Sequence, residues 1–240
     1  MYSGSRVQGT NLEASVIKLQ KISARPDYVE EVYKTLLDAI SDGSLEAGTR
    51  LKQEEIAEQM QVSRSPVLKA LLLLKKDGFV QDVPGRGVEV APMDATAISN
   101  LYMIRGALDA LAARLAAERR YEIDPKLLAA GRRVIKGKDV KAMVDADMAF
   151  HRAIYDASGN PLIAESAEVY WAHLRRAMGA GLQFATQREP IWDEHEAIAK
   201  AIAAGDSARA AELSELHTTR ARELAVRLSQ SQAEQRLAIA

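Results

Sequence analysis

From Asp94 onward the sequence shows a single kind of pattern, the apolar spacing of amphipathic helices. Helix starts are marked by Asp124-Pro125 and Asn160-Pro161, and helix stops by Gly159 and Gly205. Short connections between helices that each carry one apolar stripe predict an antiparallel bundle. We expect six helices, at about residues 94–119, 124–136, 139–157, 161–184, 189–204 and 206–230.

The segment before the bundle predicts a different unit. Ser63 is a good N-cap and Pro66 fits the first turn of a helix, while Phe79–Ala91 reads as two short strands around Pro-Gly-Arg-Gly. Three helices followed by a hairpin form a winged helix-turn-helix. The expected helices are Tyr28–Ser41, Gln53–Met60 and Ser63–Asp77.

These patterns predict a mainly α protein in four parts. The N-terminal arm, which includes a short segment with helical spacing at Leu12–Ile22, comes first. The expected parts are the arm at 1–24, the winged helix-turn-helix at 25–92, the helical domain at 93–232 and a C-terminal tail at 233–240.

Composition is that of a soluble globular protein, with 48% hydrophobic and 27% charged residues and a formal net charge of −1. No apolar run approaches the roughly 20 residues of a membrane helix, and the first residues lack the layout of a signal peptide. Cysteine is absent, which excludes disulfides and thiol chemistry. We expect a cytoplasmic protein with no membrane partner.

The start of the third helix is the expected DNA-reading element. In a helix-turn-helix the N-terminal residues of the second helix of the motif enter the major groove, and here these are Ser63, Arg64 and Ser65. Arg64 can pair with guanine or phosphate, the serines can bond phosphate, and Arg86 at the wing tip can reach a minor groove or a phosphate. The alternative is a plain helix start with an exposed arginine. Residues 25–92 hold nine basic and twelve acidic side chains, whereas a DNA-binding module usually carries a basic surface.

Polar residues interrupt the apolar stripes of three bundle helices. Asp147 and His151 are four residues apart and therefore point the same way, and His195 and His217 lie on the apolar stripes of two later helices. A buried aspartate or imidazole needs partners. Either Asp147 accepts hydrogen bonds from the histidines in a polar core, or all four residues bind a divalent metal such as Zn, Ni, Mn or Fe.

The run AGTRLKQEEIAEQMQVSRSPVLKALLLLKKDGFVQDVPGRGVEVAP resembles the DNA-binding domain of the GntR family of bacterial transcription regulators. The helical remainder resembles that family's FCD ligand-binding domain, and its six expected helices are closer to the VanR-like subgroup than to the seven-helix FadR-like one. The resemblance implies a regulator that binds double-stranded operator DNA as a homodimer. It also implies that Asp147, His151, His195 and His217 occupy the metal-binding positions of FCD domains.

The match departs from the family where DNA is read. The family usually has arginine at the positions of Glu54 and Leu68. Lys52 and Lys69 lie nearby and can substitute in part as point charges, without the fork geometry of arginine. Leu68 and Leu72 form an apolar pair on the face opposite the helix core, which predicts either packing against another domain or subunit, or plain exposure to solvent.

Arg105 lies on an apolar stripe of the first bundle helix and is suited to gripping a carboxylate. The alternative is an ion pair with Asp109, one turn along. The resemblance favours a place in the effector cavity and implies a small carboxylate-containing metabolite as the ligand. Weaker candidates for shaping this cavity are Asn160, Tyr170, His173 and Trp192.

The sequence therefore predicts a metabolite-responsive, DNA-binding regulator, expected to act as a repressor. One alternative is a metal or ligand sensor whose operator binding is weakened or altered, because Glu54 and Leu68 replace arginines. A remote alternative is a metal-dependent hydrolase. No HExxH motif, nucleophile elbow or phosphate loop supports it, and Glu194 and Glu196 are expected to point away from the stripe of His195.

Overall fold

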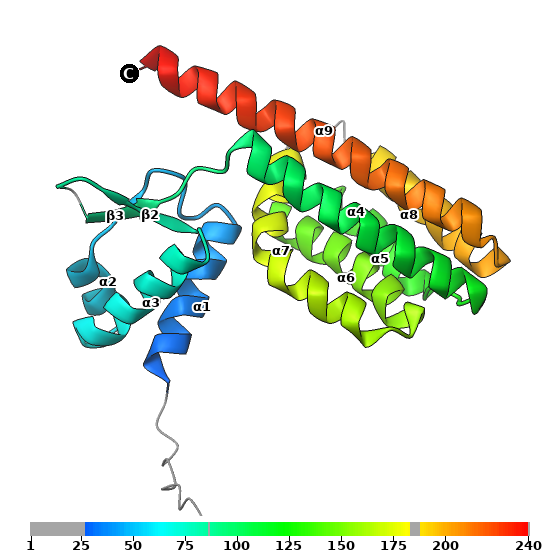
Figure 1. Ribbon diagram of the computed structural model, residues 1–240, viewed down its shortest axis with the longest axis horizontal. Coiled ribbons are helices and arrows are strands. Elements are labelled where there is room, and N and C mark those ends of the chain that lie inside the picture. Colours follow the sequence, from blue (N-terminus) through cyan, green and yellow to red (C-terminus); the bar gives the residue numbers. More distant parts are fainter. Residues whose placement is uncertain (1–26, 86, 183–187, 240) are drawn as a thin grey trace, which may run out of the picture.

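The computed structural model describes residues 27–85, 87–182 and 188–239, which form a winged domain and a helical bundle side by side (Figure 1). The expected arm at 1–24, with Leu12–Ile22, and the wing-tip residue Arg86 lie outside the described residues. Both domains have their own hydrophobic core.

The winged domain contains the expected three helices and hairpin. Its elements are α1 (Tyr28–Ser41), β1 (Arg50–Leu51), α2 (Gln53–Gln59), α3 (Arg64–Lys76), β2 (Val80–Val83) and β3 (Gly87–Val90). The sequence pattern missed β1, which is too short to show an alternation. It exists because Arg50 and Leu51 pair antiparallel with β3, so the sheet has the order β1-β3-β2.

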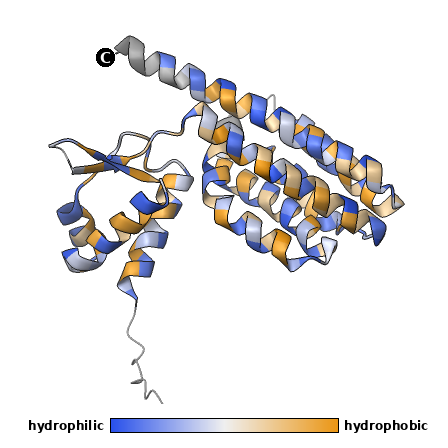
Figure 2. Cartoon of the chain, in the orientation of Figure 1, coloured by the Kyte–Doolittle hydropathy of each residue, from blue (hydrophilic) through white to orange (hydrophobic). Residues whose placement is uncertain are grey.

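The bundle is built from six helices in the described residues, as expected. They are α4 (Ala95–Glu118), α5 (Pro125–Val134), α6 (Val140–Ser158), α7 (Pro161–Leu182), α8 (Arg188–Ala204) and α9 (Ser207–Ile239). Helices α4 and α9 lie side by side along most of α4, and hydrophobic residues are concentrated where the helices face one another (Figures 1 and 2). The last helix is longer than predicted: residues 233–239 continue α9 and do not form a separate tail.

Local sequence signals fix several helix ends. The side chain of Asp94 accepts hydrogen bonds from the backbone N–H groups of Thr96 and Ala97, and that of Asp139 accepts one from the backbone N–H of Ala142 at the start of α6. Gly159 ends α6 with φ +68°, a left-handed conformation that glycine adopts without strain. These caps set where α6 begins and ends, and therefore where Asp147 and His151 lie in the bundle.

The junction between the domains is short and bonded on several sides. Four residues, 91–94, separate β3 from α4. The Ala91 carbonyl accepts a hydrogen bond from Arg176 Nη2 of α7 at 2.7 Å, and the Met93 carbonyl accepts one from Ser229 Oγ of α9 at 2.9 Å. Helix α7 also packs against α1. The bundle therefore holds the winged domain through both backbone and side chains.

None of the described helices is long and apolar enough to cross a membrane.

Candidate metal centre, effector cavity and DNA-binding face

Four side chains from three helices meet in the middle of the bundle. Asp147 and His151 come from α6, His195 from α8 and His217 from α9, and all four are buried. One ligand atom from each lies within 4.8 Å of all the others. The four residues that the sequence predicted as metal ligands therefore lie together in the structure.

The distances within this cluster favour coordination over direct hydrogen bonding. His195 Nε2 lies 3.3 Å from His217 Nε2 and 3.4 Å from Asp147 Oδ1. His151 Nε2 lies 3.8 Å from Asp147 Oδ2. N–H···O bonds usually span about 2.7–3.2 Å, so Asp147 is too far away to make good hydrogen bonds with these histidines. A core built only from Asp147–histidine hydrogen bonds does not describe this spacing.

Two carboxylates outside the cluster hold the far ring nitrogens of two histidines. Asp109 Oδ2 lies 3.3 Å from His151 Nδ1, and Glu194 Oε2 lies 2.8 Å from His217 Nδ1. A carboxylate accepts, so the proton belongs on Nδ1 and the Nε2 lone pair points into the cluster. Glu194 was expected to point away. It reaches His217 because α8 and α9 pack together and its side chain is long.

Burial favours the neutral form of two imidazoles of the cluster, those of His151 and His195. It lowers the pKa of His151, although the charge of Asp109 beside it acts in the opposite direction. Burial also lowers the pKa of His195 well below its usual value, and the nearby His217 adds to the shift. A neutral imidazole is the form that binds a metal ion.

The unsatisfied Nε2 of His151 also fits a metal ion. Within the described residues, four buried side-chain atoms find no hydrogen-bond partner, and three belong to this region: Arg105 Nη2, His151 Nε2 and His195 Nδ1. Buried polar groups are normally satisfied, so such exceptions point to something else at the site. Three imidazoles and one carboxylate suit Zn, Ni, Mn or Fe, and the outer carboxylates are the usual support of such ligands.

Asp109, which the sequence suggested only as an ion-pair partner of Arg105, lies beside this cluster and bonds several buried side chains. Its carboxylate accepts hydrogen bonds from Tyr155 Oη and, at 3.3 Å, from both Arg105 Nε and Thr218 Oγ1, besides contacting His151. Burial alone would raise the pKa of Asp109, but the charge of Arg105 and the hydrogen bonds from His151 and Tyr155 hold it well below its usual value. Asp109 is therefore an ionised, fully bonded carboxylate.

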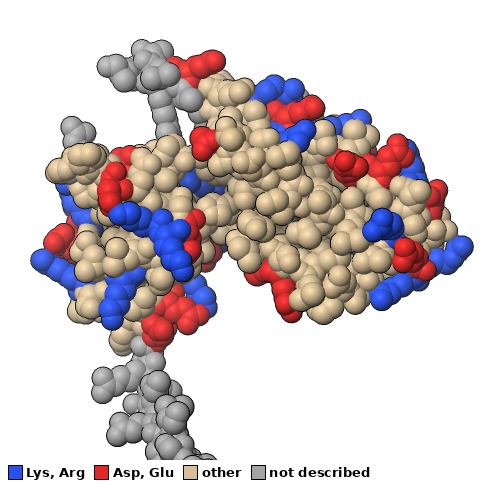
Figure 3. Space-filling model, viewed as in Figure 1, with Lys and Arg blue, Asp and Glu red and all other residues tan. Residues whose placement is uncertain are grey.

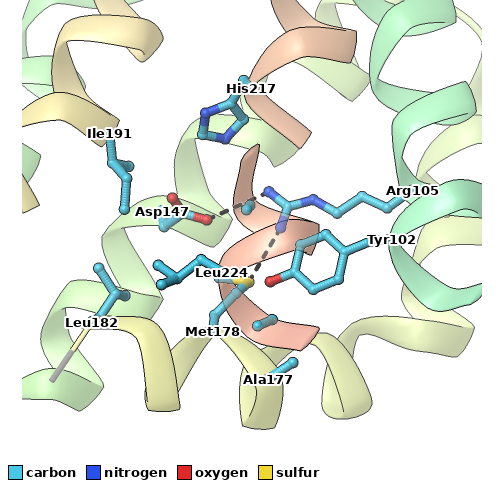
Figure 4. A pocket seen from close by; sticks show the side chains of 11 residues that line it. Tyr102, Arg105, Asp147, Ala177, Met178, Leu182, Ile191, His217 and Leu224 are labelled. Atoms are coloured by element: carbon cyan, nitrogen blue, oxygen red, sulfur yellow. Dashed lines mark hydrogen bonds and ion pairs between the residues drawn. The ribbon is translucent and has the colours of Figure 1, made fainter. Parts of the chain in front are cut away.

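Arg105 faces a small cavity next to this four-residue cluster. Its Nη2 lies 3.5 Å from Asp147 Oδ2 and its Nη1 lies 3.3 Å from the sulfur of Met178 (Figure 4). The cavity encloses about 50 Å³. Its lining is Tyr102, Arg105, Asp147, Ala177, Met178, Leu182, Ile191, His217, Ala221, Leu224 and Ala225. Both readings of Arg105 thus apply, because it pairs with Asp109 and also lines the cavity.

The other four predicted effector residues do not line this cavity. Trp192 is buried against Phe150 and His195 and packs in the core. Asn160 accepts a hydrogen bond from the backbone N–H of Leu162 at the start of α7.

Tyr170 and His173 lie at the junction with the winged domain and not in the bundle interior. The His173 ring stacks on Phe79 at 3.9 Å between centroids, and its Nε2 lies 3.0 Å from the Asp77 carbonyl oxygen. Tyr170 borders a surface hollow beside the same two winged-domain residues. A stripe on α7 therefore faces a second domain, and periodicity cannot distinguish that from a core.

On the DNA-binding face, the predicted cations are exposed and partly neutralised. Arg64 Nη1 lies 3.0 Å from Glu54 Oε1, so the acidic replacement pairs with the arginine that remains. Lys52 Nζ pairs with Glu55. Figure 3 shows basic and acidic side chains intermixed over the visible face of the winged domain.

The remaining predicted DNA contacts surround the start of α3. Ser63, Ser65 and Lys69 line a surface hollow that also borders the N-terminus of α1. Ser63 occupies the N-cap position, but its side chain makes no capping hydrogen bond, which leaves its hydroxyl available. Leu68 and Leu72 are 45% and 56% exposed, so within this chain the solvent-exposed alternative holds.

Comparison with known proteins identifies both domains. The family model of bacterial regulatory proteins, gntR family, matches residues 28–90, and the FCD domain model matches residues 100–220. An "Uncharacterized HTH-type transcriptional regulator in unstable DNA locus" of Streptomyces ambofaciens is 30% identical over 73% of this chain and 75% of that protein. A "Probable D-xylose utilization operon transcriptional repressor" of Paenarthrobacter nicotinovorans is 26% identical over 76% of this chain and 81% of that protein. Among solved structures, E. coli McbR/YncC shares the fold with a TM-score of 0.65 and 21% identity, over 80% of this chain and 94% of that chain.

Proposed function

Since the chain belongs to the GntR family of bacterial regulatory proteins and carries an FCD domain, we propose that its bundle binds a divalent metal ion and a small organic acid that controls DNA binding. The chain is a DNA-binding transcriptional regulator and not an enzyme, as its relatives are regulators. We further assign residues 25–92 to operator binding and residues 93–232 to sensing. We propose repression in the cytoplasm by a homodimer, in line with the name of the Paenarthrobacter relative.

The observation that carries the metal proposal is the convergence of four buried donors, with Nε2 of His151 left without a hydrogen-bond partner in the described part of the chain. Asp147, His151, His195 and His217 would hold the ion. Asp109 and Glu194 would orient two of the imidazoles. A bound ion of this kind supplies an electrophilic position for a carboxylate oxygen.

Arg105 supports the organic-acid proposal. It is the one cation among the cavity-lining residues, and its Nη2 finds no hydrogen-bond partner among the described residues. A guanidinium so placed can donate to a carboxylate. Its orientation is fixed by the bond from Nε to Asp109.

Helix α7 offers a route from the cavity to the DNA-binding domain. Ala177, Met178 and Leu182 line the cavity, while His173 and Arg176, about one turn away, hold the winged domain. An effector shifts a conformational equilibrium only if it binds one state better than the other. A ligand that displaces Met178 would tilt the segment of α7 that carries the domain contact.

The exposed face of α4 supports a homodimer. Met103 and Ile104 are 52% and 44% exposed, and Leu108, Leu111 and Leu115 continue the apolar stripe as partly buried residues. Figure 3 shows a broad uncharged area over the middle of the bundle, where α4 lies in Figure 1. Such a stripe fits a second copy of the chain.

The decisive experiment combines metal analysis with DNA binding. The purified full chain should contain or take up a divalent ion, and should retard a promoter fragment from its own gene neighbourhood at low salt. His217→Ala should abolish stoichiometric metal binding, and Glu215→Ala, an exposed residue of the same helix, serves as the control. Retention of metal by His217→Ala, or failure to retard any such fragment, would contradict the proposal.

A second candidate is a sensor with weakened or altered operator binding, favoured by the ion pair between Arg64 and Glu54. Changing Glu54 and Leu68 to arginine distinguishes weakened operator binding from altered operator specificity. A large gain in DNA affinity would indicate lost operator binding, and little change would indicate altered specificity. Each added phosphate contact should also steepen the salt dependence of log K by about 0.9.

A further inference from the structure

Helix α3 concentrates the positive charge of an otherwise acidic domain. Its thirteen residues hold no carboxylate and four cations, which are Arg64, Lys69, Lys75 and Lys76. Helices α1 and α2 together hold six carboxylates and one lysine. Duplex DNA is a polyanion, and its phosphates attract a helix with this charge. The exposed side of α3 is therefore the side of the winged domain that fits DNA.

Two exposed leucines lie among these cations. Leu68 follows Arg64 by four residues and Leu72 follows Leu68 by four, so all three lie along the exposed side of the helix. The opposite side of α3 forms the core contact, through the buried residues Val67, Ala70, Leu71 and Leu74. A surface that covers the exposed side must therefore be apolar opposite the leucines and anionic around them.

The major groove of DNA offers this combination at one kind of base pair. Among the base edges in the groove, only thymine presents an apolar group, its C5-methyl. Phosphates line both sides of the groove and match the surrounding cations. The side chain of leucine has no hydrogen-bond donor or acceptor, so it can read neither the polar base edges nor a phosphate. Contact with a thymine methyl removes apolar surface of both groups from water, which favours thymine opposite a leucine.

The place of Leu68 along α3 limits which base pair it can meet. The N-terminal end of this helix is the end that enters the groove, and Arg64 stands there with its Nη1 held 3.0 Å from Oε1 of Glu54. Leu68 lies about 6 Å further along the helix axis, because four residues rise about 1.5 Å each. Successive bases of one strand are about 3.4 Å apart, so this distance corresponds to about two base pairs. Leu72 lies a further turn away from the end that enters the groove.

We infer that Leu68 is a specificity-determining residue of this regulator, and that its side chain contacts the methyl group of a thymine in each operator half-site. That thymine lies about two base pairs from the base that Arg64 contacts. The inference rests on the proposed binding of operator DNA by residues 25–92. The cations around Leu68, and the hydroxyl of Ser63 that makes no capping hydrogen bond, favour DNA over a second protein chain as the occupant of this face.

Selection of random-sequence duplexes by the full chain tests this inference without a known operator. Duplexes retained at low salt, with and without added Zn²⁺, are sequenced, and the enriched half-site should contain dT at a fixed position. Replacing that dT by dU removes only the methyl group and should weaken binding about fourfold. Affinities are compared by fluorescence anisotropy at one salt concentration, because the phosphate contribution changes with salt.

Three variants show whether Leu68 is the partner of that methyl group. Leu68→Ala should bind the dT and dU duplexes with affinities that differ by less than about 1.5-fold, because the contact is lost from both sides of the cycle. Leu68→Met keeps an apolar side chain of similar volume and should still prefer dT. Leu162→Ala removes an exposed leucine from α7 of the bundle and is the matched control, with the discrimination of the wild type.

The outcomes separate this inference from the proposed operator binding. If an enriched half-site tolerates dU at every thymine, or if Leu68→Ala keeps the preference for dT, the inference is overturned and operator binding stands. If Leu68→Ala loses self-association while its DNA selection is unchanged, the leucines belong to a protein interface and the inference is again overturned. Failure to enrich any sequence overturns operator binding and this inference together.

Discussion

Replacing Arg105 by methionine tests whether its guanidinium stabilises the buried carboxylates of Asp109 and Asp147. Arg105 and Asp109 are each 3% exposed, so the loss of the guanidinium leaves two buried carboxylates without their cation. Breaking a buried pair by removing one partner costs about 3–5 kcal/mol. For a chain of this size that corresponds to a fall in melting temperature of roughly 6 to 20 °C.

The assay is calorimetric unfolding of metal-stripped protein at neutral pH. Arg133→Met, at an exposed site on α5, is the control and should change the free energy of unfolding by less than about 0.5 kcal/mol. Asp109→Asn should cost less than Arg105→Met, because Arg105 then still pairs with Asp147. The double variant should be more stable than the sum of the single effects predicts, by about 0.5–3 kcal/mol. Additive effects, or an Arg105→Met variant as stable as the control, would refute this stabilising role of Arg105.

The same variant has a defined pH dependence. The pKa of Asp109 in the folded chain is below that of an unfolded aspartate, about 3.9. Its ionised form therefore stabilises the fold fully above that value, and the contribution is lost as the pH falls further. The difference between wild type and Arg105→Met should be largest at neutral pH and should shrink as the pH falls, because without Arg105 the buried carboxylate of Asp109 takes up a proton at higher pH than in the wild type.

Three further predictions follow from individual contacts. Burial lowers the pKa of His173, so its stack on the winged domain should be stable above pH 6.5 and weaken as the pH falls below it; limited proteolysis of the junction should show this, and His173→Phe should remove the pH dependence. Glu194→Gln should weaken zinc binding about 10- to 100-fold in chelator competition, whereas Glu196→Gln, whose wild-type side chain bonds Arg132, should not. Gly131→Ala would place a Cβ 1.9 Å from the Trp192 ring and should cost about 1–3 kcal/mol in thermal unfolding, whereas Gly179→Ala meets nothing within 4 Å and should be neutral or stabilising.

Much of the architecture was predictable from local signals. Asp94, Asp124 and Asp139 act as N-caps, and Gly159 ends α6, so most helix ends fell within one or two residues of the expected positions. The convergence of Asp147, His151, His195 and His217 was also predictable, because a spacing of four along one helix and an apolar stripe on another both define a direction. The two-residue strand β1 was not, since its formation depends on β3 across the sheet.

The supporting carboxylates could not be predicted with the same certainty. Glu194 precedes His195 by one residue, so its Cβ points about 100° away around the helix axis, and its role depends on the neighbouring α9. His173 shows a second limit of prediction from helical periodicity. It was predicted to shape the effector cavity, but it lies against Phe79 of the winged domain, because whether a helix face contacts the bundle or another domain depends on tertiary packing that periodicity does not contain.

The short junction has a consequence for the spacing of the DNA half-sites that the protein can bind. Four residues span at most about 14 Å, and the carbonyls of two of them are bonded to the bundle. The two winged domains of a dimer would then move as rigid extensions of their bundles, and not independently on flexible linkers. The distance between the half-sites that they can occupy together would be fixed by bundle geometry. An operator with one base pair inserted at its centre would be rejected, even though every base contact remained available.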